Sequence, residues 1–412
     1  MMFRSWHGLC LSGSEDHFPR DAVPCPRPFH PLVFLVRRDP LRSRGYYAIS
    51  RLEELYEPEG VHCLRPCASA LPADAPGALA ALVEAHGASV LNTSFVRCFD
   101  YLLAQVRRKK AGFKVTLVGL GDVGSTVLTG LVLLGRELEE IAVYDPNAAL
   151  CARYELEMNQ ILSHDGDPLP RVTVCSEEDL FRCDLLVFTA SKGVPGLNSS
   201  EADVRLAQLE ANQALIAPYA RLARETGFLG LFCQVSDPVD QLAWTVFGES
   251  NRDGNGQFDF AGLLPEQVQG FGLGVMAARA AYIARREGIA FEQGRVYGPH
   301  GSGLVAANHW GADYDSILSD RLTGLTRDAN LRVRELGYKP YFAPGLSSAA
   351  VSLLRMLRGD DYYGSIPMGG IWFGCRSRRS TQGTAILRED ICPPLMSRLQ
   401  ETFLGLQEAV AL

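Results

Sequence analysis

The chain has 412 residues, of which 47% are hydrophobic and 21% are charged, and its formal net charge is −7. This composition excludes a largely disordered chain, a collagen-like fibre and a small disulfide scaffold. The acidic balance argues against a nucleic-acid partner, and no apolar run approaches the roughly 18–20 residues that cross a bilayer. Residues 1–20 lack the apolar core of a signal peptide, and eleven cysteines lie at irregular spacing. These features predict a cytoplasmic protein with reduced thiols and no membrane partner.

The first 110 residues are expected to be an addition to the main fold. Ten of the 23 prolines lie in the first 76 residues, which predicts an irregular segment over residues 1–30. Apolar runs at 31–36, 46–49 and 78–85 then predict a small α+β domain over residues 31–110, of unknown role. His62, Cys63 and Cys67 lack a second ligand pair, so no metal site is predicted. The basic run 107–110 is interpreted as a solvated linker.

From residue 113 onward, strand and helix patterns alternate. Strand-like runs are found at 114–118, 141–144, 171–174, 184–188 and 228–232, and helical patterns at 125–138 and 202–226, the second with an expected kink at Pro218. This alternation predicts an α/β fold with a parallel sheet covered on both faces, over residues 111–264. Residues 265–412 mix long helices with strand-like segments and predict an α+β second half.

A glycine-rich turn follows the first of these strands. Gly119-Leu-Gly-Asp-Val-Gly124 matches G-x-G-x-x-G between a predicted strand and a predicted helix, which is the context of a dinucleotide site. Asp145 ends the next predicted strand, where a carboxylate would bind the adenosine ribose hydroxyls and repel a 2′-phosphate. The pattern therefore predicts NAD in preference to NADP. A glycine-rich turn without a ligand is the alternative.

Further motifs then follow in order: Val187-Phe-Thr-Ala190, Arg205 seven residues before Asn212, Val235-Ser-Asp-Pro-Val-Asp240, Gly270-Phe-Gly272 with Arg279, and Gly298-Pro-His-Gly-Ser302. In this order, from about Lys114 to the C-terminus, they resemble the L-lactate/malate dehydrogenase family. The resemblance implies a Rossmann NAD-binding domain followed by an α+β catalytic domain. It further implies an oxidoreductase that moves a hydride between NAD and a 2-hydroxy or 2-keto acid, and a homo-oligomer.

The resemblance also assigns residues to roles. His300 would be the acid/base on the substrate oxygen, Arg279 would hold the substrate carboxylate as a bidentate fork, and Arg205 would polarise the carbonyl from a closing loop. Each of the three could instead be an ordinary turn or surface residue. The cofactor-binding residues that it implies are Gly119, Gly121, Asp122, Val123, Gly124, Asp145, Thr189, Ala190 and Ser236.

The chain departs from the family at three positions in the motifs expected to carry the catalytic chemistry. The family's histidine is oriented by an aspartate three residues before the carboxylate-binding arginine, and that position is Met276 here; the family's asparagine in Ser-Asn-Pro is Asp237; and the aspartate after His-Gly is Ser302. We hypothesise that Asp237 supplies the carboxylate that Met276 cannot, so that the substitutions relocate one charge. The alternative is a non-catalytic NAD-binding protein, regulatory or structural, derived from this family.

The expected substrate pocket departs as well. The loop after Ala190 is longer than in the family, and the position that separates lactate from malate enzymes falls at Val194 or Lys192, depending on the gap. The family's later pocket threonine falls near Lys339 or Pro340, and a lysine there would suit a keto acid with a second anionic group. Residues 251–262 resemble part of a calcium-binding EF-hand loop, but Gly262 stands where a glutamate is needed, so a surface turn is expected. Residues 1–110 are expected to be dispensable for cofactor binding.

Overall fold

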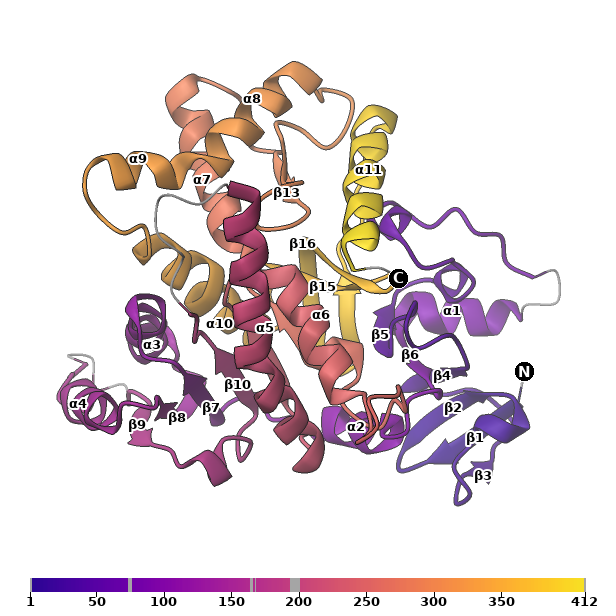
Figure 1. Ribbon diagram of the computed structural model, residues 1–412. Coiled ribbons are helices and arrows are strands. Elements are labelled where there is room, and N and C mark those ends of the chain that lie inside the picture. The colour runs from indigo at the N-terminus through magenta and orange to yellow at the C-terminus, as the bar shows by residue number, and fades with distance from the viewer. Residues whose placement is uncertain (1, 73–75, 164–165, 167, 193–200, 411–412) are drawn as a thin grey trace.

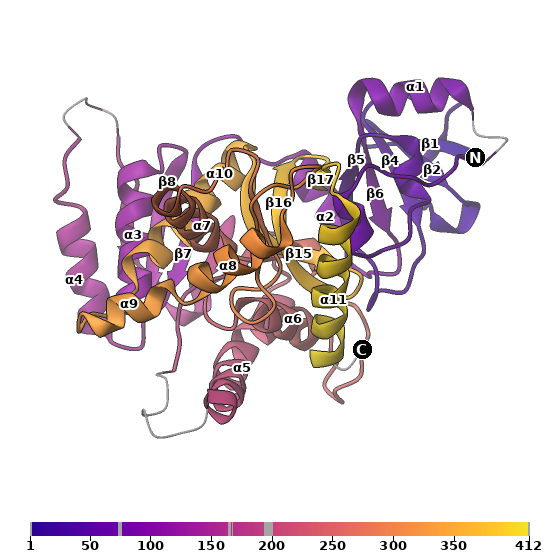
Figure 2. The same cartoon turned by 90° about the horizontal axis from the view of Figure 1, so that it is seen from above.

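The computed structural model describes residues 2–72, 76–163, 166, 168–192 and 201–410, with residues 201–207 described only as helical backbone. In this part of the chain one sheet of 15 strands runs through the molecule, in the order β3-β1-β2-β4-β6-β5-β17-β16-β15-β12-β11-β10-β7-β8-β9. Figure 2 shows the N-terminal strands at one end of the molecule and α4 at the other. The sheet therefore links segments that the sequence separates into domains.

Six neighbouring strands form the parallel part of this sheet. Their order, β12-β11-β10-β7-β8-β9, is that of a Rossmann fold. The predicted α/β class is thus confirmed. The predicted boundary at residue 264 falls too early, because the sixth parallel strand follows it. The bounds are β7 (Phe113–Val118), β8 (Leu138–Tyr144), β9 (Arg171–Val174), β10 (Leu185–Phe188), β11 (Leu231–Gln234) and β12 (Val268–Gly270).

Helices cover both faces of the parallel strands (Figure 1). Leu185 and Val187 of β10 belong to a buried cluster with α3, α4 and α10, whereas Leu186 and Phe188 belong to one with α5 and α6. Burial on both faces explains why β10 is apolar at all four positions, Leu185–Phe188. The helices are α3 (Asp122–Leu134), α4 (Ala148–Met158), α5 (Glu201–Glu225), α6 (Val239–Ser250) and α10 (Val351–Arg358). Helix α5 continues through Pro218, and α3 ends four residues before the predicted residue 138, which begins β8.

The C-terminal half continues the sheet with antiparallel strands. β15 pairs with β12, and β16 and β17 follow outward. A separate hairpin, β13–β14, carries His300 in its connecting loop. The bounds are β13 (Arg295–Tyr297), β14 (Val305–Ala307), β15 (Tyr362–Met368), β16 (Ile371–Ser380), β17 (Gly383–Ile386), α7 (Leu273–Glu287), α8 (Ser316–Arg327), α9 (Ala329–Glu335) and α11 (Pro393–Ala409). Among the described residues, none of the helices has the length and apolar character needed to cross a membrane.

The N-terminal segment is more regular than predicted. The expectation of an irregular segment over residues 1–30 is wrong, because β1 and β2 lie there and β2 pairs in parallel with β4. Pro19, Pro26 and Pro28 fall between strands and Pro24 falls at a strand end, so they interrupt no ladder. The bounds are β1 (Met2–Trp6), β2 (Leu9–Gly13), β3 (Val23–Pro24), β4 (Leu32–Val36), β5 (Tyr46–Ile49), β6 (Ala88–Asn92), α1 (Gly77–His86) and α2 (Cys98–Val106).

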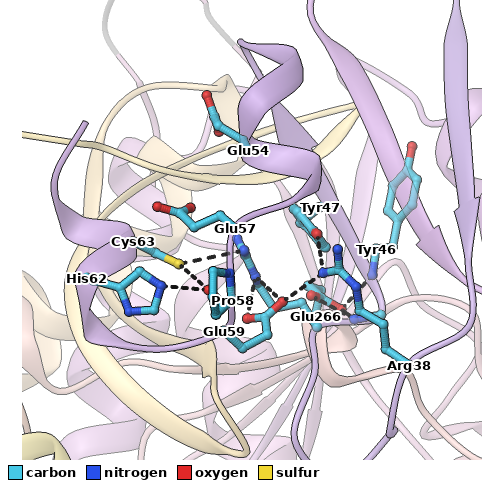
Figure 3. A network of polar contacts seen from close by, with 12 residues as sticks. Arg38, Tyr46, Tyr47, Glu54, Glu57, Pro58, Glu59, His62, Cys63 and Glu266 are labelled. Atoms are coloured by element: carbon cyan, nitrogen blue, oxygen red, sulfur yellow. Dashed lines mark hydrogen bonds and ion pairs between the residues drawn. The ribbon is translucent and has the colours of Figure 1, made fainter. Parts of the chain in front are cut away.

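Buried contacts join this N-terminal segment to the rest of the chain. The Glu266 carboxylate, 1% exposed, accepts the backbone N–H groups of Gly45 and Tyr46 at 2.8–3.1 Å (Figure 3). The ring of Phe95 packs edge-on against Phe247, with centroids 6.2 Å apart. These contacts complete a core shared by both halves and so argue against the prediction that residues 1–110 are dispensable for cofactor binding.

We expect that deleting residues 1–109 makes the remaining chain aggregate. The deletion would expose Phe247 and its neighbours and strip the buried Glu266 of its two N–H donors, Gly45 and Tyr46, and each such loss costs about 1–3 kcal/mol. Soluble yield and size-exclusion profile of the truncated variant, compared with the full chain, provide the measurement. A monodisperse truncated protein with a cooperative thermal transition would contradict this account of the interface.

Candidate active site

The glycine-rich turn between β7 and α3 leaves room where a phosphate would sit. Gly119 has φ +93°, and a Cβ there would lie 2.6 Å from the Ala190 nitrogen, while a Cβ on Gly124 would lie 1.9 Å from the Gly119 oxygen. Both positions therefore require glycine. A Cβ on Gly121, the N-cap of α3, would meet nothing within 4 Å, and no side chain caps this helix start. Open space at uncapped N–H groups suits an anionic phosphate.

Asp145, directly after β8, borders this turn. Its Oδ2 accepts the N–H of Leu120 and its Oδ1 accepts the N–H of Asn147, both at 2.9 Å. These two bonds fix the carboxylate beside the glycine-rich turn, at the place where the sequence predicts a ribose contact.

The ends of β10 and β11 complete the rim. The hydroxyl of Thr189 donates to the carbonyl of Gly119 at 2.7 Å, and the hydroxyl of Ser236 donates to the carbonyl of Ala190 at 2.7 Å. Parallel strands end at the same edge of a sheet, so these residues lie at the crevice where such sheets bind ligands.

His300 and Asp237 are in direct contact, although they are 63 residues apart. His300 Nδ1 lies 2.8 Å from Asp237 Oδ1, and this carboxylate oxygen accepts a hydrogen bond from the ring N–H. Burial alone would lower the pKa of His300, but the charge and hydrogen bond of Asp237 outweigh it, and the pKa of His300 is raised. The other ring nitrogen, Nε2, is buried without a hydrogen-bond partner among the described residues. That nitrogen is left for the oxygen of a ligand.

A second carboxylate, Asp240, holds the backbone of the same loop. It accepts the N–H of His300 at 3.3 Å and the hydroxyl of Ser365. Burial raises its pKa to about 6. Gly272 permits this close packing, since a Cβ there would lie 2.9 Å from His300 Cβ. The loop is thus anchored both from α6 and from the start of α7.

Arg279 on α7 is half-buried near this pair and has no ion-pair partner in the described part of the chain. Burial lowers its pKa, and the charge of Asp237 opposes that shift. Its nearest hydrogen-bonding contact is the sulfur of Met276, 3.8 Å from Nη1. A half-buried guanidinium with no ion-pair partner in the described part of the chain is available to an anionic ligand.

The remaining predicted residues are not gathered into one cluster. Arg205 belongs to α5, but its side chain lies outside the described residues, as does Val194. Lys192 is exposed, and its backbone N–H donates to Asn212 Oδ1 at 2.9 Å. Lys339 Nζ lies 2.9 Å from Asp122 Oδ2, which places it beside the glycine-rich turn instead of against a substrate pocket.

Sequence reasoning did not assign Asp240 or Asn212 to the site. Asn212 donates to the carbonyl of Asp237 at 2.8 Å and also accepts from the backbone N–H of Lys192, so it ties the segment after Ala190 to the partner of His300. Both residues lie inside the motifs on which the resemblance rests. Their role depends on burial beside polar partners, which the sequence does not show.

The described residues contain one group with metal-ligating geometry, Glu57, His62 and Cys63 (Figure 3). Glu57 pairs with Arg388 at 2.6 Å, and Arg44 approaches the Cys63 sulfur. Two guanidinium groups beside these ligands oppose a cation there. In the 251–262 loop, Asp259 pairs with Arg224 and Asp253 accepts turn N–H groups, as in an ordinary surface turn.

Comparison with known proteins finds relatives of low sequence identity. No family profile matches the chain. It is 26% identical to the L-lactate dehydrogenase of Staphylococcus haemolyticus over 59% of this chain and 74% of that protein. It is 28% identical to the malate dehydrogenase of Sulfurimonas denitrificans over 58% and 73%.

Solved structures agree on the fold. A lactate dehydrogenase from a Medee basin deep-sea metagenome superposes with a TM-score of 0.58 at 19% identity, covering 73% of this chain and 98% of its own. The malate dehydrogenase of Archaeoglobus fulgidus, solved with NADH, gives 0.58 at 17% identity, covering 72% and 98%. About a quarter of this chain has no counterpart in these structures. By sequence and by fold, the chain is a relative of the L-lactate and malate dehydrogenases.

Proposed function

We propose that this protein is an NAD-dependent oxidoreductase that interconverts a 2-keto acid and a 2-hydroxy acid. The observation that carries the proposal is the 2.8 Å contact between His300 and Asp237, with Nε2 unpartnered among the described residues and Arg279 close by. A proton donor and a carboxylate-binding cation in one place are what reduction of a keto acid requires. Arg205, on the helix after the substrate loop, is proposed to polarise the substrate carbonyl.

The residues would act in a defined order. Arg279 binds the substrate carboxylate with its guanidinium fork and so orients the keto group. NAD, when bound, supplies or accepts the hydride. His300 Nε2–H gives its proton to the keto oxygen as charge develops there, and the imidazole becomes neutral. Asp237 holds Nδ1–H throughout, so the proton that moves is always the one on Nε2.

The glycine-rich turn fits a dinucleotide, and Asp145 would make the site prefer NADH to NADPH. We expect NADH to bind at least about tenfold more tightly than NADPH, because a 2′-phosphate would meet the Asp145 carboxylate, and tenfold corresponds to about 1.4 kcal/mol. Asp145→Asn removes the charge, so the preference should shrink; its single oxygen can replace only one of the two that accept the N–H groups of Leu120 and Asn147. Fluorescence titration measures both constants, with the surface variant Asp179→Asn as control. Equal affinities in the wild type would reject this role.

Arg279→Lys tests the carboxylate fork. Lysine keeps the charge but offers a single ammonium in place of two parallel N–H donors, so kcat/KM for the preferred keto acid should fall by more than about tenfold. Arg285→Lys, an exposed change on the same helix, should have no effect. A loss smaller than tenfold at Arg279 would argue against bidentate binding.

A panel of 2-keto acids with NADH tests the function as a whole, read as loss of NADH absorbance. Turnover with at least one keto acid supports the proposal. NADH binding without turnover across the panel would instead favour a non-catalytic NAD-binding protein, the role that the loss of the family's aspartate at Met276 suggests. The Asp237–His300 contact is the observation that weighs against that alternative.

Substrate choice, assembly and location extend the proposal. Exposed Lys192 supports a substrate with a second anionic group, while Lys339 is engaged by Asp122. Homo-oligomerisation is supported by exposed apolar side chains on and after α9, namely Leu331, Leu336, Tyr338 and Phe342. A cytoplasmic location is supported by eleven free cysteines.

A further inference from the structure

A second pocket lies at the opposite edge of the parallel strands from the glycine-rich turn. Its cavity of about 370 Å³ is lined by Phe113, Leu185 and Leu231, which are the first residues of β7, β10 and β11. The proposed cofactor site lies at the carboxyl ends of the same strands. The pocket is therefore separate from that site, and it is large enough for a small organic ligand.

The charges around this pocket are unbalanced. Arg107, Arg108, Lys109 and Arg379 line it, and Asp184 is the carboxylate among its lining residues. In the described part of the chain none of the four cations forms an ion pair, and Asp184 Oδ2 accepts the backbone N–H of Lys114 at 2.8 Å. The basic run at residues 107–110 was interpreted from the sequence as a solvated linker. In the structure, three of its residues line this cavity.

Arg379 on β16 is the most unusual of these cations. It is 1% exposed, and within the described chain its donors reach only neutral groups: the Tyr101 hydroxyl at 2.7 Å, the Gln105 amide oxygen at 2.8 Å and the Thr384 hydroxyl at 3.2 Å. Its Nε has no partner among the described residues. A buried guanidinium without a counter-ion is costly, and an anion in the cavity would offset that cost.

Arg108 brings a second guanidinium to the same space. It is half-buried, lies over the Phe113 ring at 5.7 Å, and donates to the carbonyl of Leu357 at 3.1 Å. Burial, helped by the nearby charge of Arg379, lowers its pKa to about 10. The Leu357 carbonyl that accepts from Arg108 belongs to the last turn of α10 and carries only part of a unit negative charge. Two guanidinium groups therefore share a cavity with little negative charge to offset them.

We propose that this pocket binds a small multivalent anion, a phosphate ester or a dicarboxylate, between Arg108 and Arg379. Guanidinium forks match the oxygens of both groups. The pocket is built from α2, the parallel strands and β16. A bound anion would therefore link the N-terminal segment to the parallel strands and to the antiparallel C-terminal strands. Occupancy should raise the thermal stability of the full-length protein.

Isothermal titration of the full chain with pyrophosphate, and separately with succinate, tests the proposal. Whichever probe binds identifies the class of anion. Arg108→Gln should weaken that binding by at least about tenfold and abolish the accompanying rise in melting temperature. Arg182→Gln, a change at an exposed arginine outside the pocket, should leave both unchanged.

Two further variants keep the result interpretable. Arg107→Gln changes an exposed pocket residue that cannot unfold the protein by cavity formation, and it should weaken binding in the same direction. Arg279→Gln should leave the binding intact, because that arginine belongs to the proposed active site. Absence of binding by both probes, or binding that survives Arg108→Gln and Arg107→Gln, would overturn the proposal without touching the proposed dehydrogenase activity.

Discussion

Replacement of His300 by glutamine is expected to lower keto-acid reduction by about 10²–10⁴-fold, the usual contribution of a positioned general acid. Glutamine fills a similar volume and can still donate to Asp237, but it has no proton to give to a substrate oxygen. His300 is not among the residues proposed to hold the cofactor, so NADH affinity should stay within about twofold. Initial rates of NADH oxidation and a fluorescence titration measure the two effects.

His86→Gln is the matched control, because His86 is exposed at the end of α1. It should retain wild-type rates. If His300→Gln kept more than about a tenth of wild-type activity, the proton would have to come from elsewhere, and His300 would be a structural residue of the loop.

Replacement of Asp237 by asparagine is expected to move the pH profile of reduction to lower pH by about one unit or more. Reduction needs the protonated imidazole, which exists below the pKa of His300. Burial lowers that pKa and Asp237 raises it; with the carboxylate gone, burial is opposed mainly by Asp240. At neutral pH the variant should therefore be slower, by about tenfold for each pH unit that the profile moves.

Asp313→Asn is the control for this change. Asp313 lies 3.8 Å from His309 but is 90% exposed, so solvent screens the pair and its loss should not alter the profile. An unchanged profile in Asp237→Asn would remove the carboxylate from the account of the chemistry, even if the variant were less active.

The glycine-rich turn and the parallel strands could be predicted because their signals are local. Gly119 and Gly124 are needed for contacts with Ala190 and with the turn itself, and the predicted bounds of β9 match the structure at both ends. The contact between Asp237 and His300 was reachable only through the spacing of two motifs. Asp240 was not, because its role depends on packing against Ser365, 125 residues away.

The interface with the N-terminal segment could not be predicted. Glu266 meets Gly45 across 221 positions, and Arg379 meets Tyr101 across 278. No short-range pattern marks a carboxylate that will accept backbone N–H groups of a distant strand. The same holds for β1 and β2, whose strand character was hidden by the prolines of the turns around them.

Measurement of the pKa of His300 tests the central claim most directly, and this measurement needs no substrate. Selective ¹⁵N labelling of the eight histidines, with His300→Gln identifying the resonance, gives the pKa of this imidazole by NMR titration. We predict a pKa above the ordinary value of about 6.5 in the wild type and a fall of about one unit or more in Asp237→Asn. A wild-type pKa below the ordinary value, or one that Asp237→Asn leaves unchanged, would contradict the claim that Asp237 is the carboxylate partner of His300.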